Sequence, residues 1–247
     1  MVSAGQDGTV RVWAPKTGMS KHVFRLVEGG GGGGEYGGGE EEEDGPGTGL
    51  TCLAVGGGSD GQLAIAGGEN GTAYVVHISG KKLVATLPHY DESPGGVAAQ
   101  APTGDTMEED DQVVEARSVE AVGFCPSTTP GTAHWCATGG VDGILKIWIM
   151  GSGGAQLRNR CQREDSEKGG ITRLRWHESL PLVIASYTDG KVCIWDVRMG
   201  KMVDCLTGHE DMINDMDVSF VSGSTSAIVV TGSDDKSVRM FELHSTV

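Results

Sequence analysis

Apolar and polar positions alternate along this chain in short runs that a recurring turn separates. The clearest case is 182–198, where alternation stops at the turn Thr188-Asp189-Gly190, resumes after it and ends at Trp195. Two alternating runs joined by an Asp-Gly turn predict a tight β-hairpin. A single hairpin says little about a protein, but this one recurs.

The hairpin occurs five times, each time with a turn residue six positions before a bulky apolar residue. Glycine follows the turn residue in four of the five, because the turn needs a positive φ that other residues resist. Such repetition predicts a repeat architecture. The pairs are Asp7 and Trp13, Asn70 and Val76, Asp142 and Trp148, Asp189 and Trp195, and Asp235 and Phe241.

The strand before each of the last four hairpins has apolar residues at i, i+3 and i+5. Strict alternation would give i, i+2 and i+4, so the spacing predicts a β-bulge at the start of that strand. A fourth apolar run follows each complete hairpin, which gives a unit of four antiparallel strands, here lettered a to d. The spaced residues are Leu50, Leu53 and Val55; Val119, Val122 and Phe124; Ile171, Leu174 and Trp176; and Ile213, Met216 and Val218.

The Gly-x-x-Asp-Gly-x-x-x-x-Trp units, with Gly208-His209 before the last, resemble WD40 repeats. The resemblance implies an all-β fold, a partial WD40 β-propeller with about five of seven or eight blades, three of them complete. It also implies a buried network of turn Asp, inner Ser or Thr, loop His and Trp in each blade. The residues assigned to this structural network are Asp7, Trp13, Asp142, Trp148, Ser186, Asp189, Trp195, His209, Thr231 and Asp235.

Not every unit carries the full set of network residues. His209 in the last unit is the one loop histidine that the pattern finds, and Phe241 there cannot donate a hydrogen bond as Trp would. Asn70 and Val76 depart further from the pattern. We therefore expect the second blade to be the least well tied.

The predicted units and inserts account for nearly all of the chain. The first and last units have three strands each and the others four, so we expect the C-terminal portion of a longer protein or a shortened gene model. The units span 1–24, 49–88, 117–161, 169–206 and 209–247, and the inserts span 26–48 and 89–116.

The charge of the chain is concentrated in the two inserts. The chain has 34 acidic and 19 basic residues, a net charge of −15, and the inserts hold 7 and 8 acidic residues without Lys or Arg. Their glycine-rich, acidic composition predicts weak structure. The acidic tracts are Glu40, Glu41, Glu42, Glu43 and Asp44, and Glu108, Glu109, Asp110 and Asp111.

In WD40 blades the d–a and b–c loops emerge on one face, so the resemblance places both acidic inserts beside the turns. Acidic tracts there would attract a partner with a basic segment and repel nucleic acid. The alternative is that they are solvated expansions without a partner. With the tracts, the interface candidates are the residues before each turn residue: Glu69, Val141, Thr188 and Asp234.

Enzymatic chemistry finds little support in the sequence. The run from Gly56 to Gly61 matches a dinucleotide-binding fingerprint but leads into a second strand, so no helix N-terminus would meet a phosphate. No catalytic triad or metal-ligand spacing occurs, and the six cysteines stand singly, as buried reduced thiols do. We expect no cofactor, metal, membrane or small-molecule substrate, and a cytoplasmic location with the nucleus as an alternative.

Several segments narrow the resemblance. The amino-acid sequences of segments 117–125, 157–162 and 189–198 are similar to those of the angio-associated migratory cell protein family. The members of this family are cytoplasmic WD40 proteins, and a fungal relative chaperones a basic ribosomal protein. The resemblance implies a non-enzymatic protein-binding scaffold that uses one propeller face, with a duty as chaperone or assembly factor for a basic ribosomal protein. The alternative is a generic WD40 adaptor in cytoskeletal, signalling or cell-migration pathways. An enzymatic function would need a catalytic domain outside this chain.

Overall fold

The computed structural model describes residues 1–26, 48–56, 62–90, 117–126, 134–164, 169–220 and 226–243. In this part of the chain, eighteen strands form five antiparallel sheets, called blades 1 to 5 in chain order. Three sheets have four strands, and the first and last have three, which confirms the predicted all-β propeller blades. The described ranges hold no helix that is long and apolar enough to cross a membrane.

Strands that follow one another in the sequence are neighbours in each sheet. This connection needs only tight turns inside a blade, which is what the hairpin pattern specifies. Blade 1 contains β1 (Val2–Ala4), β2 (Thr9–Ala14) and β3 (Met19–Arg25); blade 2, β4 (Leu50–Gly56), β5 (Leu63–Gly68), β6 (Thr72–His77) and β7 (Lys82–Pro88); blade 3, β8 (Val119–Phe124), β9 (Trp135–Gly140), β10 (Leu145–Gly151) and β11 (Gly154–Cys161); blade 4, β12 (Ile171–Trp176), β13 (Leu182–Tyr187), β14 (Val192–Asp196) and β15 (Lys201–Leu206); and blade 5, β16 (Ile213–Phe220), β17 (Ala227–Ser233) and β18 (Val238–Leu243).

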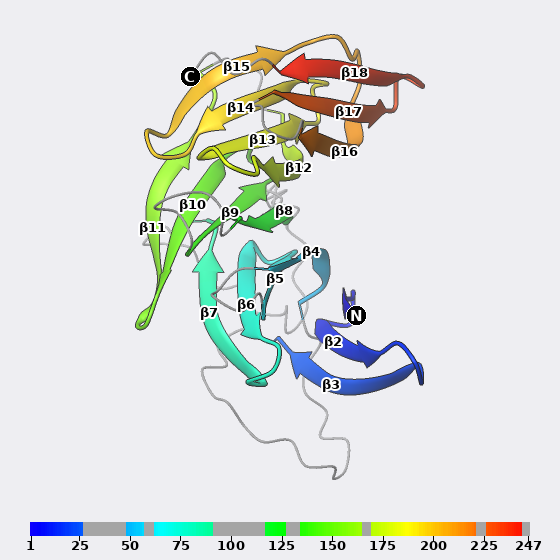
Figure 1. Ribbon diagram of the computed structural model, residues 1–247, viewed down its shortest axis with the longest axis vertical. Helices are drawn as coiled ribbons and strands as arrows, with labels where there is room; N and C mark the ends of the chain where they lie inside the picture. Colours follow the sequence, from blue (N-terminus) through cyan, green and yellow to red (C-terminus); the bar gives the residue numbers. More distant parts are fainter. Residues whose placement is uncertain are drawn as a thin grey trace, which may run out of the picture.

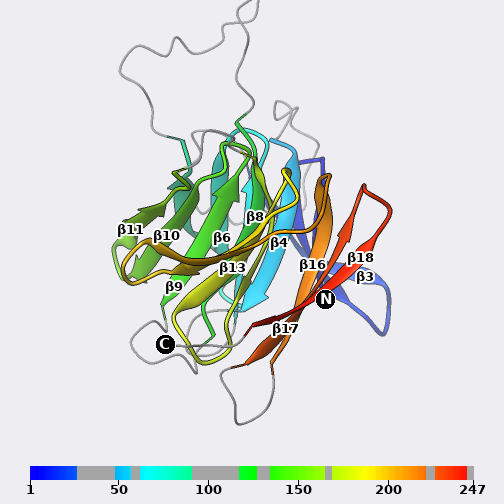
Figure 2. The same cartoon turned by 90° about the horizontal axis from the view of Figure 1, so that it is seen from above.

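The blades follow one another along an open arc (Figure 1). Strands β4, β8, β12 and β16 lie along its inside, whereas β7, β11 and β15 form its outer edge. In the view from above, the sheets lie side by side with their faces toward one another (Figure 2). Blades 2 to 4 can therefore bury both faces against their neighbours, whereas blades 1 and 5 each have a neighbour on one face in this chain.

The predicted bulges are confirmed at the start of all four inner strands. The pairing register shifts between Leu50 and Cys52, and it shifts at the equivalent places of β8, β12 and β16. A second shift, which the apolar pattern did not reveal, precedes the bulky residue of strand c in blades 1 to 4, for example between Ile194 and Trp195. The extra residue gives each blade additional local twist.

The turn glycines adopt the predicted positive φ. Gly8, Gly71, Gly143 and Gly190 have φ between 69° and 79°. Lys236 holds the same place in blade 5 with φ 67°, a conformation that side-chain-bearing residues seldom adopt.

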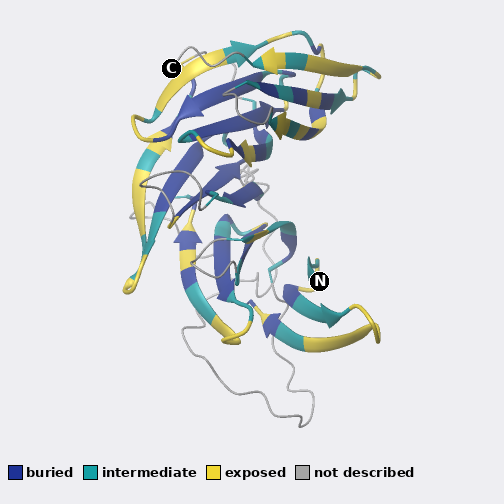
Figure 3. Cartoon of the chain, viewed as in Figure 1, coloured by how far each residue is buried: buried dark blue, intermediate teal, exposed yellow. Residues whose placement is uncertain are grey.

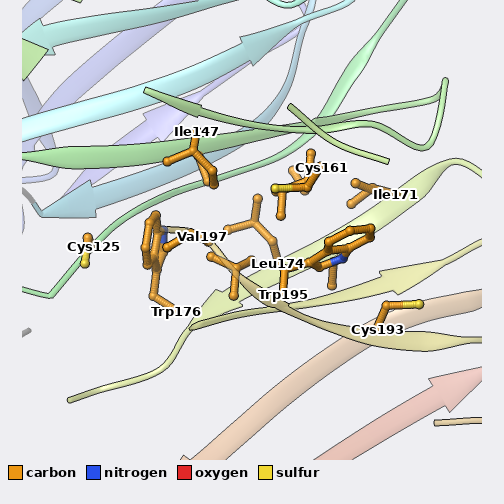
Figure 4. Close-up of a cluster of buried hydrophobic side chains, with 14 of the residues drawn as sticks. Cys125, Ile147, Cys161, Ile171, Leu174, Trp176, Cys193, Trp195 and Val197 are labelled. Atoms are coloured by element: carbon orange, nitrogen blue, oxygen red, sulfur yellow. The ribbon is translucent and has the colours of Figure 1, made fainter. Parts of the chain in front are cut away.

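The apolar core is divided into four clusters, each between two adjacent blades. The largest joins blades 3 and 4, and Trp176, Trp195, Ile147 and Ile171 meet in it (Figure 4). Figure 3 shows buried inner and middle strands beside exposed outer ones. The blades are thus held together by face-to-face packing, to which polar contacts at the loops are added.

Candidate functional site: one face of the arc and the networks beneath it

The turns between strands b and c lie against the segments that lead into strand a of the same blade. Backbone amides of the residues before the turn residues donate to carbonyls in those segments in four blades. Turns and d–a loops therefore share one face of the arc, called the turn face here. The amide–carbonyl pairs are Glu69 to Gly49 (2.9 Å), Val141 to Ser118 (3.1 Å), Thr188 to Gly170 (2.9 Å) and Asp234 to Met212 (3.0 Å).

Both acidic inserts begin and end on this face. The Leu26 amide donates to the turn carbonyl of Gly8 at 3.0 Å, and the His89 amide donates to Gly71 at 2.9 Å. The predicted binding residues 40–44 and 108–111 themselves lie outside the described residues. The described anchors fix only the face from which each insert leaves and to which it returns.

The four interface candidates differ in exposure and in contacts. Glu69, Thr188 and Asp234 are exposed, whereas Val141 is half-buried. The Gln6 amide donates to the Glu69 carboxylate at 2.9 Å and so joins blades 1 and 2, a contact that the sequence did not suggest. In blade 5, Asn214 donates to the Asp234 carboxylate at 2.6 Å.

Exposed carboxylates stand at both ends of the turn face. Glu69 lies toward one end, and Glu210, Asp211 and Asp234 lie together in the loop and turn of blade 5. Two exposed cations lie on the same face, Arg117 at the entry to blade 3 and Lys236 in the turn of blade 5, against four exposed carboxylates. The face thus carries net negative charge even without the residues of the inserts.

A four-residue network lies beneath the turn face in blade 3. The Trp148 indole donates to the Thr138 hydroxyl at 3.0 Å, and that hydroxyl bonds with Nδ1 of His89 at 2.8 Å. Nε2 of His89 lies 3.4 Å from the Asp142 carboxylate, and the imidazole is wholly buried. In this arrangement the Thr138 hydroxyl can donate to Nδ1 while the Nε2–H group donates to the Asp142 carboxylate.

His89 corrects the expectation that the last unit alone has the network histidine. The sequence assigned this residue to an insert, yet it directly follows β7 and reaches across to blade 3. Blade 3 therefore has the complete set of donors and acceptors.

Blade 5 repeats the arrangement without the tryptophan. His209 bonds through Nδ1 with Asp235 at 2.7 Å and through Nε2 with the Thr231 hydroxyl at 2.8 Å. The Ser237 hydroxyl donates to Asp235 at 2.6 Å, a contact that the sequence did not predict. The structure thus brings together the three network residues expected in this blade.

In blade 4 an arginine replaces the histidine. Arg163 binds both carboxylate oxygens of Asp189, at 3.0 and 2.6 Å, and its guanidinium stacks over the Tyr187 ring at 4.8 Å. The Trp195 indole donates to the Tyr187 hydroxyl at 3.2 Å. Arg163 and Tyr187 were both missed by the sequence interpretation.

Ser186 does not join this network, which corrects its assignment. Its hydroxyl bonds with Thr172 at 2.8 Å. The position that faces the tryptophan lies four residues before the turn Asp, as Ser3 and Thr138 do, and blade 4 has Ala185 there. Because side chains alternate along a strand, the neighbouring serine points to the opposite face of the sheet.

The first two blades have smaller networks. In blade 1, Asp7 accepts from Thr9 at 2.7 Å and from Arg11 at 2.9 Å, and the Trp13 indole donates to Ser3 at 2.8 Å.

In blade 2, the Asn70 amide donates to the Tyr74 hydroxyl at 2.8 Å. Leu26 occupies the place that His89 has in blade 3, as their matching amide bonds to turn glycines show. The expectation that blade 2 is the least well tied stays a prediction.

These contacts alter the acidity of the turn carboxylates. Burial opposes ionisation of Asp142 and Asp189, but hydrogen bonds from His89 and Arg163 hold the pKa of each carboxyl below its ordinary value. In blade 5 the Ser237 hydroxyl, together with His209, lowers the pKa of Asp235. All three are therefore carboxylates at neutral pH, and each one accepts hydrogen bonds as an anion.

The described residues contain no group of His, Cys, Asp or Glu that could hold a metal ion. The polar side chains beneath the turn face also satisfy one another, because no buried side-chain nitrogen or oxygen atom in the described ranges lacks a partner. What the turn face offers is a broad exposed surface with negative charge.

Comparisons with known proteins agree with this architecture. The family model "WD domain, G-beta repeat" matches residues 159–196 and 200–242. The angio-associated migratory cell proteins of Canis lupus familiaris and Homo sapiens are each 31% identical over 96% of this chain and 44% of their own length. An uncharacterized WD repeat-containing protein of Schizosaccharomyces pombe is 23% identical over 98% of the chain and 48% of its length.

Among solved structures, Saccharomyces cerevisiae Sqt1 matches with a TM-score of 0.69 and 16% identity, over 99% of this chain and 55% of that one. At this identity the likeness shows the fold alone. The chain spans about half the length of the curated relatives that it matches.

Proposed function

The chain is a WD40-repeat protein, and from that premise we propose that it binds a partner protein with a basic segment through its turn face. The WD40 fold is one of protein interaction, and proteins of this kind are generally scaffolds without catalytic activity. The finer proposal is that this chain serves as a chaperone or assembly factor for a basic ribosomal protein. The resemblance noted in the sequence supplies this partner class.

The observation that carries the proposal is the placement of negative charge. The described turn face bears exposed carboxylates at Glu69, Glu210, Asp211 and Asp234. Both inserts, which hold 15 of the 34 acidic residues, are anchored on that face. Charge concentrated on one surface accelerates association with an oppositely charged partner and favours it over others.

The same charge argues against direct binding of nucleic acid, whose phosphates need basic partners. A membrane and a small-molecule substrate also have no part in the proposal. A cytoplasmic location is part of the proposal, with the nucleus as the alternative, and cell fractionation tests this.

The second candidate function is a generic WD40 adaptor in cytoskeletal, signalling or cell-migration pathways, which the likeness to the migratory cell proteins favours.

Affinity capture from a cell extract at low and high salt tests the proposal. Four forms of the protein are compared. They are wild type, a turn-face variant with Glu69→Gln and Asp234→Asn, an insert variant in which residues 40–43 become Gln, and the matched control Asp204→Asn on the outer strand β15. We expect wild type and the control to capture a basic protein at low salt. High salt and both neutralised forms should lose that protein. Partners that ignore salt and neutralisation would favour the adaptor function.

A further inference from the structure

Two cysteines face each other across the outer hairpin of blade 4. Cys193 on β14 and Cys205 on β15 are direct cross-strand partners. Their sulfur atoms lie 3.2 Å apart. Cys193 lies in the core cluster between blades 3 and 4 (Figure 4), whereas Cys205 is only partly covered.

The backbone spacing of such a pair suits a disulfide. Opposed residues in antiparallel strands have Cα atoms about 4.5 or 5.5 Å apart, and disulfides span Cα separations of about 4.4–6.8 Å. Because an S–S bond is about 2.05 Å long, the two sulfurs need to approach each other by only about 1 Å. Side-chain rotation can supply this movement without a change in strand register.

Cys52, the other partly covered thiol, provides a useful contrast. Its sulfur lies 3.3 Å from the carbonyl oxygen of Val119 in the next blade, and its side chain is near the Thr51 hydroxyl. It has similar exposure to Cys205 but faces oxygen atoms, where Cys205 faces a second sulfur. Exposure alone therefore does not distinguish the two thiols, but their nearest partners do.

We propose that Cys193 and Cys205 form a reversible disulfide when the protein meets a hydroperoxide. The Cys205 thiolate attacks the terminal peroxide oxygen, the O–O bond breaks, and an alcohol or water leaves with the proton. The sulfur of Cys193 then attacks the Cys205 sulfenic acid, the S–S bond forms and water leaves. Two thiols lose two electrons and two protons, and the peroxide is reduced.

The order of attack follows from the surroundings of each sulfur. Burial, followed by the neighbouring Cys205 thiol, raises the pKa of Cys193 above its ordinary value, so its thiolate is scarce. Cys205 is the more exposed residue of the pair, so a peroxide in solution meets it more readily than Cys193. The bond would join β15, which has no further strand beside it in its sheet, covalently to the buried strand β14. This modification is independent of the proposed binding function.

Peptide mapping of the full chain tests the proposal directly. After hydrogen peroxide treatment, free thiols are alkylated and the protein is cut with trypsin without a reductant. Trypsin cuts after Arg198 and Lys201, so the two cysteines lie on separate peptides unless a disulfide joins them. We expect the linked pair to be the dominant disulfide, with the loss of two of the six thiols, and to disappear on reduction.

Two variants separate the pair from general oxidation. Cys205→Ser should abolish the linked peptide, and Cys52→Ser should leave it at the level of wild type. A wild-type digest with no such peptide, while other thiols become oxidised, would overturn the proposal. So would disulfides spread evenly among the cysteines, or an equal loss in the two variants.

Discussion

Blades 3 and 4 perform the same task with different chemistry. In each, a residue from the loop after the preceding blade reaches the turn aspartate and so ties neighbouring blades together. In blade 3 this residue is His89, which links Asp142 to Thr138. In blade 4 it is Arg163, which grips both carboxylate oxygens of its aspartate.

The networks of blades 3 and 4 differ at several residues together and not at a single position. Blade 3 has a threonine to accept the tryptophan N–H, and the histidine completes the chain of hydrogen bonds. Blade 4 has Ala185 at that place, so the Tyr187 hydroxyl accepts from Trp195, and the same ring stacks with Arg163. The comparison teaches that the polar link between neighbouring blades is kept although the residues that form it are replaced together.

Acid should cause the largest loss, because it reaches the carboxylates of both networks at once. Asp142 and Asp189 have pKa values below the ordinary 3.8, so each contributes stability above that pH and loses it as the pH falls through its folded pKa. Urea unfolding at a series of pH values should show the free energy of unfolding falling below about pH 4. A variant with Asp142→Asn and Asp189→Asn should flatten that fall, and an equally steep slope would contradict the assignment.

Asp189→Ala should be the most destabilising single change in the comparison. It leaves the Arg163 guanidinium, whose side chain is only 4% exposed, without its carboxylate partner. Breaking a buried ion pair on one side costs about 3 kcal/mol or more, and chemical denaturation would measure the loss. Adding Arg163→Met to this variant should restore part of the stability, because the buried guanidinium that has lost the Asp189 carboxylate is then removed as well. Additive losses in the double variant would show that the two residues are not coupled.

His89→Ala should cost less than Asp189→Ala, because the Asp142 carboxylate keeps the hydrogen bond from the Ile144 backbone amide and is 24% exposed to solvent. Thr138 and Asp142 each lose a partner, so a loss of about 1–3 kcal/mol in the free energy of unfolding is expected. The exposed His134→Ala is the matched control and should stay within about 0.5 kcal/mol of wild type. If the two variants unfold alike, His89 does not tie blades 2 and 3.

Tyr187→Phe and Ser186→Ala distinguish the observed network of blade 4 from the predicted one. Removal of the Tyr187 hydroxyl leaves the buried Trp195 N–H without its acceptor, for which about 1–2 kcal/mol is expected. Removal of the Ser186 hydroxyl affects a bond with Thr172 and should cost about 0.5–1 kcal/mol. Thermal unfolding of both variants measures the order, and a larger loss for Ser186→Ala would reverse the assignment.

Local pattern was enough to predict the hairpins, the inner-strand bulges and the number of strands, because period and turn chemistry act over a few residues. The networks depend on partners far apart in the sequence. His209 and Arg163 both precede their turn aspartates by 26 residues, so spacing could have revealed the arginine. His89 lies 53 residues before Asp142, because an insert lies between them, and no constant spacing would have found it.

The misplacement of Ser186 has a similar physical cause. Strand residues alternate between two faces, so a shift of one position moves a side chain to the other side of the sheet. Counting four residues back from each turn aspartate gives Ser3, Thr138 and Thr231, but Ala185 in blade 4. The spacing of four residues before the turn aspartate could therefore be read from the sequence. What it could not show is that a tyrosine two positions further on would supply the missing hydroxyl.

Neutralising the turn face should have the smallest effect on stability. Glu69 and Asp234 are exposed, and each accepts one side-chain hydrogen bond from an exposed amide, so Glu69→Gln with Asp234→Asn should change the free energy of unfolding by less than about 0.5 kcal/mol per site. Replacing residues 40–43 with Gln should likewise leave stability unchanged. Calorimetry measures this, and capture of a basic partner should weaken in the same proteins. A large loss of stability would mean that these carboxylates hold the blades together as the buried networks do, and the division between a tied interior and a free binding face would fail.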